Sequence, residues 1–365
     1  MVKVVIGANF GDEGKGLMTD YFASRMGGNG VVVLSNGGPQ RGHTVVNNGR
    51  RHVFHHFGSG TFNGYETYCP RQFIVNPIVF CREKYELIYR FGISPDLSMH
   101  PDCMITTPWD MMANQVCEMN RTDRHGSCGM GIWETIKRDK VIPLRYKHEI
   151  TKSFIRDIRD YYRKKFEEKY HPDYMDLFFE NDDLIYSFVR DCDHMFNNVN
   201  IDTECLLNDF DNIIFENGQG LLLDENNKDY QPHTTPSSTG LRNPSKIMSS
   251  SKTKSDVEVC YVTRSYLTRH GAGKMPNELD KRQISELIAE DLTNIPNEWQ
   301  GSLRYGQISP SDLQERIRKD FQKYAPVGAK MSIAVTHMNE YYPEWADSIG
   351  NYHSFSENTI QTERV

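Results

Sequence analysis

A chain of 365 residues is long enough for one large α/β domain or two medium ones. Hydrophobic residues make up 38% and charged residues 25%, and no stretch approaches the roughly eighteen uninterrupted apolar residues that span a bilayer. The formal net charge of −7 excludes a general basic surface for nucleic acid, although local dipoles and a few arginines can still hold small anionic substrates. The eight cysteines are scattered without a C-x-x-C pair, which favours reduced thiols in a cytoplasm over a zinc site or a disulfide framework.

The chain begins with a predicted strand, a glycine-rich turn and a helix. Lys3–Gly7 is a β-branched run that ends in glycine, and Lys15–Met26 has the apolar spacing of a helix. A second buried strand is predicted at Val31–Ser35, before a loop with three glycines. The pair Asn48-Gly49 then predicts a β-hairpin whose strands are Thr44–Asn47 and Arg51–Phe57.

The later part of the chain alternates helical and strand patterns. An amphipathic helix is predicted at Ser153–Tyr170, and segments 224–256 and 294–310 are either linkers or loops that close over a ligand. Strands separated by helical segments predict an α/β fold, with a mainly parallel central sheet, flanking helices and a site at the carboxyl ends of the strands. Further short core strands are predicted at Asn212–Phe215, Glu258–Thr263 and Ser332–Thr336.

The first turn, residues 7–16 (GANFGDEGKG), is a candidate phosphate-binding loop. Its glycines let backbone N–H groups approach an anion, the following helix supplies a positive dipole end, and Lys15 adds a full charge. The loop differs from an ordinary P-loop, because Asn9 replaces the first glycine and Gly16 replaces the Ser or Thr that binds Mg²⁺. Asp12 is therefore the candidate metal ligand. A turn that only reverses the chain is the alternative, and the order of strand, loop, lysine and helix favours the phosphate site.

Polar residues of two later glycine loops are candidate partners of this site. If the first two strands are neighbours, as sequential strands usually are, His43 lies beside Asp12 and the two form an acid–base pair. Taken alone, such a histidine is more often a hydrogen-bonded structural residue. Gln219 stands at the mouth of a glycine loop that follows a strand, although amides cap loops in many proteins.

Taken in order, these segments resemble the adenylosuccinate synthetase family. The family's G-D-E-G-K-G occurs here at Gly11–Gly16 and its G-H-T at Gly42–Thr44, while its H-x-x-P-S-G, G-A-Q-G-x-L-L-D and T-R-x-G-x-G-P-x-P-T-E motifs are similar to residues 55–60, 217–224 and 268–278. The chain is most like the compact branch found in archaea and phages. The resemblance implies one domain over residues 1–365, with a P-loop-like loop after the first strand and helical and loop insertions at 78–200 and 264–325.

The resemblance implies a carbon–nitrogen ligase that joins L-aspartate to C6 of a 6-oxopurine nucleotide. A nucleoside triphosphate phosphorylates O6, and the aspartate amine then displaces that phosphate. Asp12 would take the N1 proton and ligate Mg²⁺ together with the Gly42 carbonyl, His43 would donate to O6, and Lys15 would hold the donor phosphates. Relatives pair as homodimers, and the subunit-crossing arginine falls within Lys137–Arg145.

The resemblance also implies the remaining site residues. The catalytic set is Asp12, Lys15, His43 and Gln219. The donor nucleotide would contact Gly11, Asp12, Glu13, Gly14, Lys15, Gly16, Leu17, Thr336, His337 and Asn339. The acceptor purine nucleotide would contact Asp12, Gln40, Arg41, Gly42, His43, Ser127, Cys128, Gln219 and Thr235. L-Aspartate would contact Gly301, Ser302, Leu303 and Arg304, and the planar guanidinium of Arg304 suits a carboxylate.

Departures from the family pattern bear on the substrates. The family reads the donor base with T-K-x-D, whose carboxylate accepts two N–H bonds from guanine, whereas this chain has Asn339 at the last position. An amide can give and take one bond each with adenine, which favours ATP over GTP. Phage relatives use ATP and condense aspartate with dGMP towards 2-aminoadenine. That reaction, with dGMP or GMP as acceptor, is the favoured prediction, and IMP with GTP is the alternative.

Two other classes of protein need fewer of these residues. A kinase that phosphorylates a nucleotide and stops there would need the first loop and Asp12, and it would release ADP without aspartate. A non-catalytic nucleotide-binding module would not need Asp12, His43 and Arg304 together. The ordered motifs favour the ligase over both.

Overall fold

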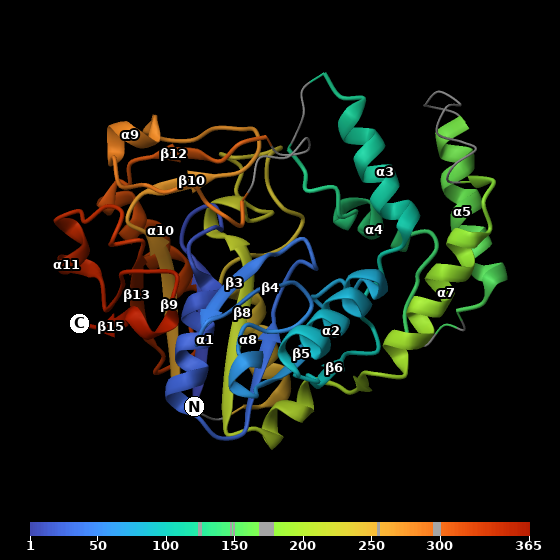
Figure 1. The fold of residues 1–365 in the computed structure, drawn as a ribbon, viewed down its shortest axis with the longest axis horizontal. Helices are drawn as coiled ribbons and strands as arrows, with labels where there is room; N and C mark the ends of the chain where they lie inside the picture. The colour runs from blue at the N-terminus through green and yellow to red at the C-terminus, as the bar shows by residue number, and fades with distance from the viewer. Residues whose placement is uncertain (123–125, 147, 149, 168–178, 254–255, 295–300) are drawn as a thin grey trace.

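The computed structural model describes the chain except residues 123–125, 147, 149, 168–178, 254–255 and 295–300. Within that part, a ten-stranded sheet crosses the molecule (Figure 1). Neighbouring strands in it are parallel, apart from the last pair, β14 and β15. From one edge to the other, its strands are β15 (Thr362–Arg364), β14 (Tyr352–Ser354), β13 (Lys330–Thr336), β9 (Val257–Arg264), β1 (Val2–Gly7), β8 (Asn212–Gly220), β2 (Gly30–Leu34), β5 (Glu66–Cys69), β6 (Leu97–Met99) and β7 (Asn200–Ile201).

Two smaller sheets accompany the central one. The predicted hairpin is confirmed as β3 (His43–Asn47) and β4 (Arg50–Phe54), and both turn residues, Asn48 and Gly49, have the positive φ that such tight turns require. The second is a three-stranded antiparallel sheet in the order β10 (Leu267–Arg269), β12 (Arg304–Gly306) and β11 (Glu278–Leu279).

Helices cover both faces of the central sheet. Side chains of β1 alternate between two apolar clusters, with Val5 in the cluster that contains α1 residues and Val4 in the cluster that contains α8 and α10 residues. Burial on both faces is typical of a parallel sheet. The described helices are α1 (Lys15–Met26), α2 (Pro77–Phe91), α3 (Pro108–Met119), α4 (Ile132–Asp139), α5 (Lys152–Glu167), α7 (Asp183–Phe196), α8 (Arg242–Ser251), α9 (Lys281–Ile284), α10 (Pro310–Tyr324) and α11 (Trp345–Ile349).

One predicted feature of the topology is wrong. The first two strands were expected to be neighbours, but β8 lies between β1 and β2, pairing Phe215 with Val4 and Val33. The reason is that the apolar stretch Ile213–Phe215 of β8 packs into both apolar clusters, and a central position in the sheet buries both of its faces. The strand also continues to Gly220, so the predicted glycine loop after Phe215 forms the end of β8.

The other predicted elements agree closely with the structure. The α1 helix has the predicted bounds, and the predicted strands at 258–263 and 332–336 are β9 and β13. The predicted helix Ser153–Tyr170 is α5, and its last three residues lie outside the described part of the chain. None of the helices described combines the length and apolar character that a membrane span requires.

Candidate active site

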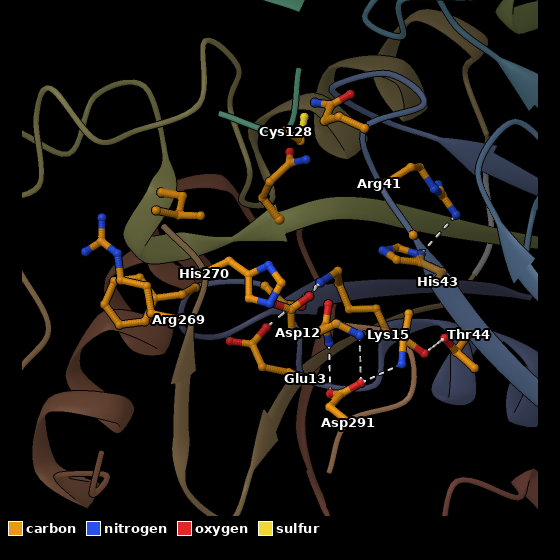
Figure 2. A pocket seen from close by; sticks show the side chains of 18 of the residues that line it. Asp12, Glu13, Lys15, Arg41, His43, Thr44, Cys128, Arg269, His270 and Asp291 are labelled. Atoms are coloured by element: carbon orange, nitrogen blue, oxygen red, sulfur yellow. Dashed lines mark hydrogen bonds and ion pairs between the residues drawn. The ribbon is translucent and has the colours of Figure 1, made fainter. Parts of the chain in front are cut away.

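A cavity of about 940 Å³ lies where the central strands β1, β8, β9 and β13 end. The cavity is therefore at the carboxyl edge of the parallel sheet, as predicted. The start of the hairpin, the segment between α3 and α4, and residues 289–294 supply the rest of its wall. Figure 2 shows side chains from these separate segments gathered around one space.

Most of the predicted site residues line this cavity. They are Gly11, Asp12, Glu13, Gly14, Lys15, Gly16, Leu17, Gln40, Arg41, Gly42, His43, Ser127, Cys128, Gln219, Thr235, Thr336, His337 and Asn339. Asp12 and His43 therefore share one cavity, although their strands β1 and β2 are not neighbours. The connection is made by α1, which packs against β3, where His43 begins the strand.

The glycine-rich loop adopts backbone conformations that favour glycine. Gly11 and Gly14 have φ of 128° and 91°, and Gly14 is the N-cap of α1. Lys15 is folded onto its own loop, where Nζ donates to the Gly11 carbonyl and lies 3.9 Å from Glu13 Oε2. Burial lowers the pKa of Lys15 and raises that of Glu13 to about 7. Because the raised pKa leaves Glu13 partly protonated near neutral pH, Glu13 neutralises Lys15 only in part. Lys15 can therefore attract an anion at the N-terminus of α1.

Asp12 presents an uncommitted carboxylate. In the described residues its side chain has no hydrogen bond or ion pair, whereas its backbone carbonyl accepts a hydrogen bond from Arg264 Nε. Arg264 in turn forms an ion pair of 2.8 Å with Asp291. The backbone of Asp12 is thus held while its carboxylate stays available to a ligand.

His43 belongs to a buried network around Glu216 of β8. Glu216 Oε1 lies 2.6 Å from His43 Nδ1, and Oε2 lies 2.7 Å from Arg41 Nη2, with all three side chains at most 8% exposed. The hydroxyl and backbone N–H of Ser59 also donate to Glu216. The turn over residues 55–60, which resembles the family's H-x-x-P-S-G motif, therefore contributes to this network.

The short contact with Glu216 determines which ring nitrogen of His43 carries the proton, whereas burial keeps the ring neutral. These hydrogen bonds and the Arg41 charge outweigh burial and hold the pKa of Glu216 far below its usual range, so the carboxylate is charged and Nδ1 carries the proton between them. Burial, with the Arg41 charge, lowers the pKa of His43 to about 3. His43 is consequently a neutral imidazole whose Nε2 accepts hydrogen bonds.

Two amides line the cavity near its centre. Gln219 has a positive φ of 56°, a strained backbone for a residue other than glycine, and its Oε1 accepts from Asn36 at 3.4 Å. Both polar atoms of the Gln40 amide are buried without a hydrogen-bond partner among the described residues. A buried amide with no protein partner is a site where a ligand can both give and accept a hydrogen bond.

The two ends of the cavity differ in their residues. At one end, Ser127 and Cys128 precede α4, and the Ser127 hydroxyl accepts from Asn114 at 2.9 Å. At the other end, β13 leads into Thr336, whose hydroxyl donates to the Glu13 carbonyl at 2.9 Å and so joins this strand to the phosphate loop. His337 and Asn339 follow, and His337 also has a positive φ, 61°.

Two predicted contacts have a different setting from the one expected. The Arg41 side chain is 0% exposed and its Nη2 is committed to the ion pair with Glu216, so only Nε and Nη1, which are buried without a partner in the described residues, remain for a ligand. Residues 301–304 are not among the described residues that line the cavity. Arg304 forms a two-point ion pair with Glu278 and donates to the carbonyl of Gly273 at 2.8 Å. The Glu278 carboxylate therefore already binds the guanidinium of Arg304, which was predicted to bind L-aspartate.

Reasoning from the sequence missed several residues of the site, both in the buried network behind the cavity wall and on the wall itself. Glu216 follows the predicted strand directly, and a carboxylate at the end of an apolar run is a signal that could have identified it. Arg51, Arg264, Asp291 and Thr293 line the cavity but lie in segments without a recognised motif.

The sequence comparisons are consistent with this geometry. A sequence model of the adenylosuccinate synthetase family matches residues 4–302. The chain belongs to this family. It is therefore a carbon–nitrogen ligase of the adenylosuccinate synthetase type, and members of the family bind nucleotides and use Mg²⁺.

Similar curated proteins are bacterial adenylosuccinate synthetases. The protein from Mesoplasma florum is 29% identical over 324 residues, which cover 86% of this chain and 73% of the relative. The protein from Dichelobacter nodosus is 28% identical over 306 residues, covering 80% of this chain and 67% of the relative.

Two solved structures share the fold. The fully ligated adenylosuccinate synthetase from Plasmodium falciparum superimposes with a TM-score of 0.71 at 14% identity, covering 100% of this chain and 99% of its own. The succinoaminodeoxyadenylate synthetase of cyanophage S-2L, bound to dGMP and dATP, gives 0.67 at 14% identity, covering 100% and 95%. These likenesses confirm the α/β fold with its mainly parallel central sheet.

Proposed function

We propose that this ligase condenses L-aspartate with C6 of dGMP or GMP and uses ATP as the donor, giving a 2-aminoadenylosuccinate nucleotide. The observation that carries the donor assignment is Asn339 on the cavity wall, where the family pattern has an aspartate. An aspartate carboxylate accepts both N1–H and N2–H of guanine. An asparagine amide offers one donor and one acceptor, the arrangement that matches adenine N6 and N1.

The acceptor site is compatible with guanine. The Asp12 carboxylate is uncommitted and has two oxygens, so it can accept from both N1–H and N2–H of a guanine ring. The solved cyanophage protein of the same fold was obtained with dGMP and dATP, which supports a place for this chain in the compact archaeal and phage branch. The bacterial relatives support the second candidate, IMP with GTP.

The residues of the cavity can perform both steps of the reaction. Asp12 takes the N1 proton, so that O6 attacks the terminal phosphorus of the donor and the nucleoside diphosphate leaves. The aspartate amine then forms a bond to C6, the bond from C6 to the phosphorylated oxygen breaks, and the departing phosphate takes up the proton that the amine loses. His43 supports the charge on O6. An anionic group at Nε2 raises the pKa of the imidazole, which then donates.

The cavity fits the Mg²⁺ that the family uses. The described residues contain no group of three or more acidic, histidine or cysteine ligands. Mg²⁺ in nucleotide sites is usually held by one or two carboxylates together with substrate phosphates, and the uncommitted Asp12 carboxylate and the Gly42 carbonyl on the cavity wall suit that role. When bound, the ion supplies charge neutralisation for phosphoryl transfer. We also propose that the protein forms a homodimer, as the resemblance to the family implies.

An acceptor panel tests the proposal directly. The purified enzyme is given L-aspartate, Mg²⁺ and either ATP or GTP, with IMP, dIMP, GMP or dGMP, and diphosphate release and product mass are measured. Aspartate-dependent ADP release with dGMP or GMP, together with a product of the succinyl-adduct mass, is expected. The proposed substrates would be refuted if IMP with GTP gave the highest aspartate-dependent activity of all the pairs. ADP release without aspartate would indicate a kinase instead.

The variant Asp12→Asn tests the proposed base, because it keeps the size of the side chain and removes the carboxylate. Its kcat is expected to fall by about 10²–10⁴ because the base is lost. Its affinity for ATP in excess EDTA should change little, because the backbone amides and Lys15 hold the phosphates without the metal. Single-turnover kinetics and nucleotide titration measure the two quantities. Near-normal kcat in this variant would show that Asp12 is not the base.

A further inference from the structure

Arg51 of β4 is a cavity-lining residue, and most of the N–H groups of its guanidinium have no partner among the described residues. Its Nη2 donates to Thr293 Oγ1 at 2.8 Å, and its Nε is buried without a hydrogen-bond partner in the described residues. The ion pair that it forms with Glu357 is long, 3.8 Å, and the Glu357 side chain is 60% exposed. A guanidinium has five N–H donors in a planar fork, so this one has donors to spare for a ligand.

Two hydroxyl groups lie beside this guanidinium. Thr293 Oγ1 is 2.7 Å from Thr44 Oγ1, and both residues line the cavity. Thr44 follows His43 directly on β3, so the cluster is next to the residue expected at O6 of the purine. Figure 2 shows Thr44 beside the phosphate loop and close to His43. We call Arg51, Thr44 and Thr293 the hairpin cluster.

The loop that carries Thr293 also connects the hairpin cluster to Asp12. Asp291 Oδ1 accepts from the Thr293 backbone N–H at 2.9 Å, and Asp291 forms its ion pair with Arg264, which holds the Asp12 carbonyl. The position of Thr293 therefore depends on the same arginine that positions the backbone of the proposed base. A ligand on the hairpin cluster would lie within the reaction site.

We propose that the hairpin cluster binds a carboxylate of L-aspartate; this assignment rests on the proposed function of the cavity as an aspartate-dependent ligase. A planar carboxylate accepts two parallel bonds from a guanidinium and a further bond from a hydroxyl. The donor phosphates already have the loop amides and Lys15. Arg304, the arginine that the sequence assigned to aspartate, is occupied by Glu278 and does not line the cavity among the described residues.

The charges around Arg51 are compatible with a carboxylate ligand. Because Glu357 is largely exposed, the substrate carboxylate can displace it without burying an unpaired charge. Asp291, the other acidic group of this loop, is committed to Arg264 and to the backbone of Thr293 and Asn294. Within the described part of the chain, the guanidinium of Arg51 therefore lines the cavity without a tightly bound acidic partner.

The neighbouring residue Arg50 offers a matched control. It precedes Arg51 on the same strand, so its side chain points to the other face of the hairpin. Its guanidinium lies 4.6 Å from the centre of the Phe62 ring, and Arg50 is not among the residues that line the cavity. Arg50→Gln removes the same charge from the same strand outside the site.

The experiment compares Arg51→Gln, Arg51→Lys and Arg50→Gln by steady-state kinetics with the best acceptor and donor. For Arg51→Gln, the KM for L-aspartate is expected to rise at least tenfold, while the KM for ATP stays within twofold of the parent value. Arg51→Lys keeps the charge without the fork, so its KM for aspartate should be intermediate. Arg50→Gln should match the parent. Added guanidinium ion should partly restore aspartate affinity in Arg51→Gln.

Three results would overturn the assignment. A rise in the KM for ATP with an unchanged KM for aspartate would place a donor phosphate on the hairpin cluster. Unchanged KM values together with a lower melting temperature would show that the hairpin cluster only holds the loop of residues 289–294 against the hairpin. Equal effects from Arg50→Gln would show a general charge effect. Failure of the parent enzyme to release ADP with aspartate and any purine acceptor is a separate result, and it refutes the proposed function itself.

Discussion

Glu216 is the residue on which the acid–base end of the cavity depends. It places a buried negative charge between Arg41 and His43, fixes the Nδ1 proton of the imidazole and accepts two further bonds from Ser59. Its expected contribution to chemistry is to position His43, because His43 lines the cavity and Glu216 does not.

We expect Glu216→Gln to impair both activity and stability. The amide keeps the shape of the side chain but leaves the Arg41 charge buried without compensation, which costs about 3–5 kcal/mol when one partner of a buried pair is lost. Loss of the fixed Nδ1 proton should lower kcat by about 10²-fold or more. Urea unfolding and kcat measure the two effects.

A milder variant of a neighbouring residue weakens the same network and helps to separate its effect on catalysis from its effect on stability. Ser59→Ala removes one hydroxyl donor from Glu216 without removing a charge. It should cost about 1 kcal/mol in unfolding free energy and reduce kcat by a small factor. If Glu216→Gln folds and retains normal kcat, the network has only a structural role.

Asn339 is the residue that we propose decides the choice between ATP and GTP. Asn339→Asp restores a carboxylate that can accept two N–H bonds from guanine, so the ratio of kcat/KM for GTP over ATP should rise by about 10-fold or more, the worth of roughly one hydrogen bond to a charged group. Competition between the two triphosphates measures the ratio. An unchanged ratio would contradict the assignment of Asn339 as the base-reading residue.

Among the elements, α1 connects the phosphate loop to distant parts of the chain. Its buried Asp20 accepts hydrogen bonds from Asn47 of β3, from Asn63 and from Thr359 near the C-terminus. The helix that begins at Lys15 is thereby fastened to the hairpin that carries His43. The relative position of these two residues depends on a buried carboxyl that neither of them contacts.

Burial raises the pKa of Asp20 from 3.8 to about 6, and this predicts a pH dependence of stability. A group whose pKa is raised in the folded state contributes stability that is fully present below its unfolded pKa and is lost as pH rises through the folded pKa. The parent protein should therefore lose up to about 3 kcal/mol relative to Asp20→Asn between pH 4 and pH 7.

Urea unfolding of the two proteins at several pH values within that range measures this difference. The asparagine variant has its own constant cost, because its amide presents N–H groups to neighbouring donors. That cost shifts the plot of unfolding free energy against pH by a constant amount and does not change its slope. A constant difference between the two proteins across the range would show that Asp20 does not ionise there.

For the molecule as a whole, the cavity wall combines segments that are far apart in the sequence. The ends of central strands, the loop after β10, the segment between α3 and α4, and residues 289–294 all contribute. A ligand that contacts several of these segments binds only the folded protein. Binding should therefore raise the stability of the whole fold.

Mg²⁺ and ATP together should stabilise the protein measurably. At a concentration 100 times its Kd, a ligand that binds only the folded state adds about 2.7 kcal/mol, which should raise the melting temperature by several degrees. Thermal unfolding measures this with Mg·ATP, with Mg·GTP and with ATP in excess EDTA. The shift should be largest with Mg·ATP and small with EDTA. Equal shifts with and without the metal would contradict a site built around Asp12 and Mg²⁺.

Much of the fold and of the nucleotide site was predictable because the signals are local. The bounds of α1, the turn at Asn48-Gly49 and the loop from Gly11 to Gly16 follow from hydrophobic spacing and glycine positions within short stretches of chain. The motifs of the family lie in the same short stretches, so the residues around the phosphate loop were identified without knowledge of the topology.

The order of the strands and the partners of the site residues were decided by the tertiary structure. His43 and Glu216 are 173 positions apart, and they meet only because β8 enters the sheet between β1 and β2. In the same way, packing pairs Arg304 with Glu278 and directs Arg51 into the cavity. The sequence alone determined which chemical groups the chain carries near its glycine loops. Which of those groups are neutralised by a neighbour and which remain free for a ligand depends on contacts between distant segments, because a charge is compensated by whatever is close in space.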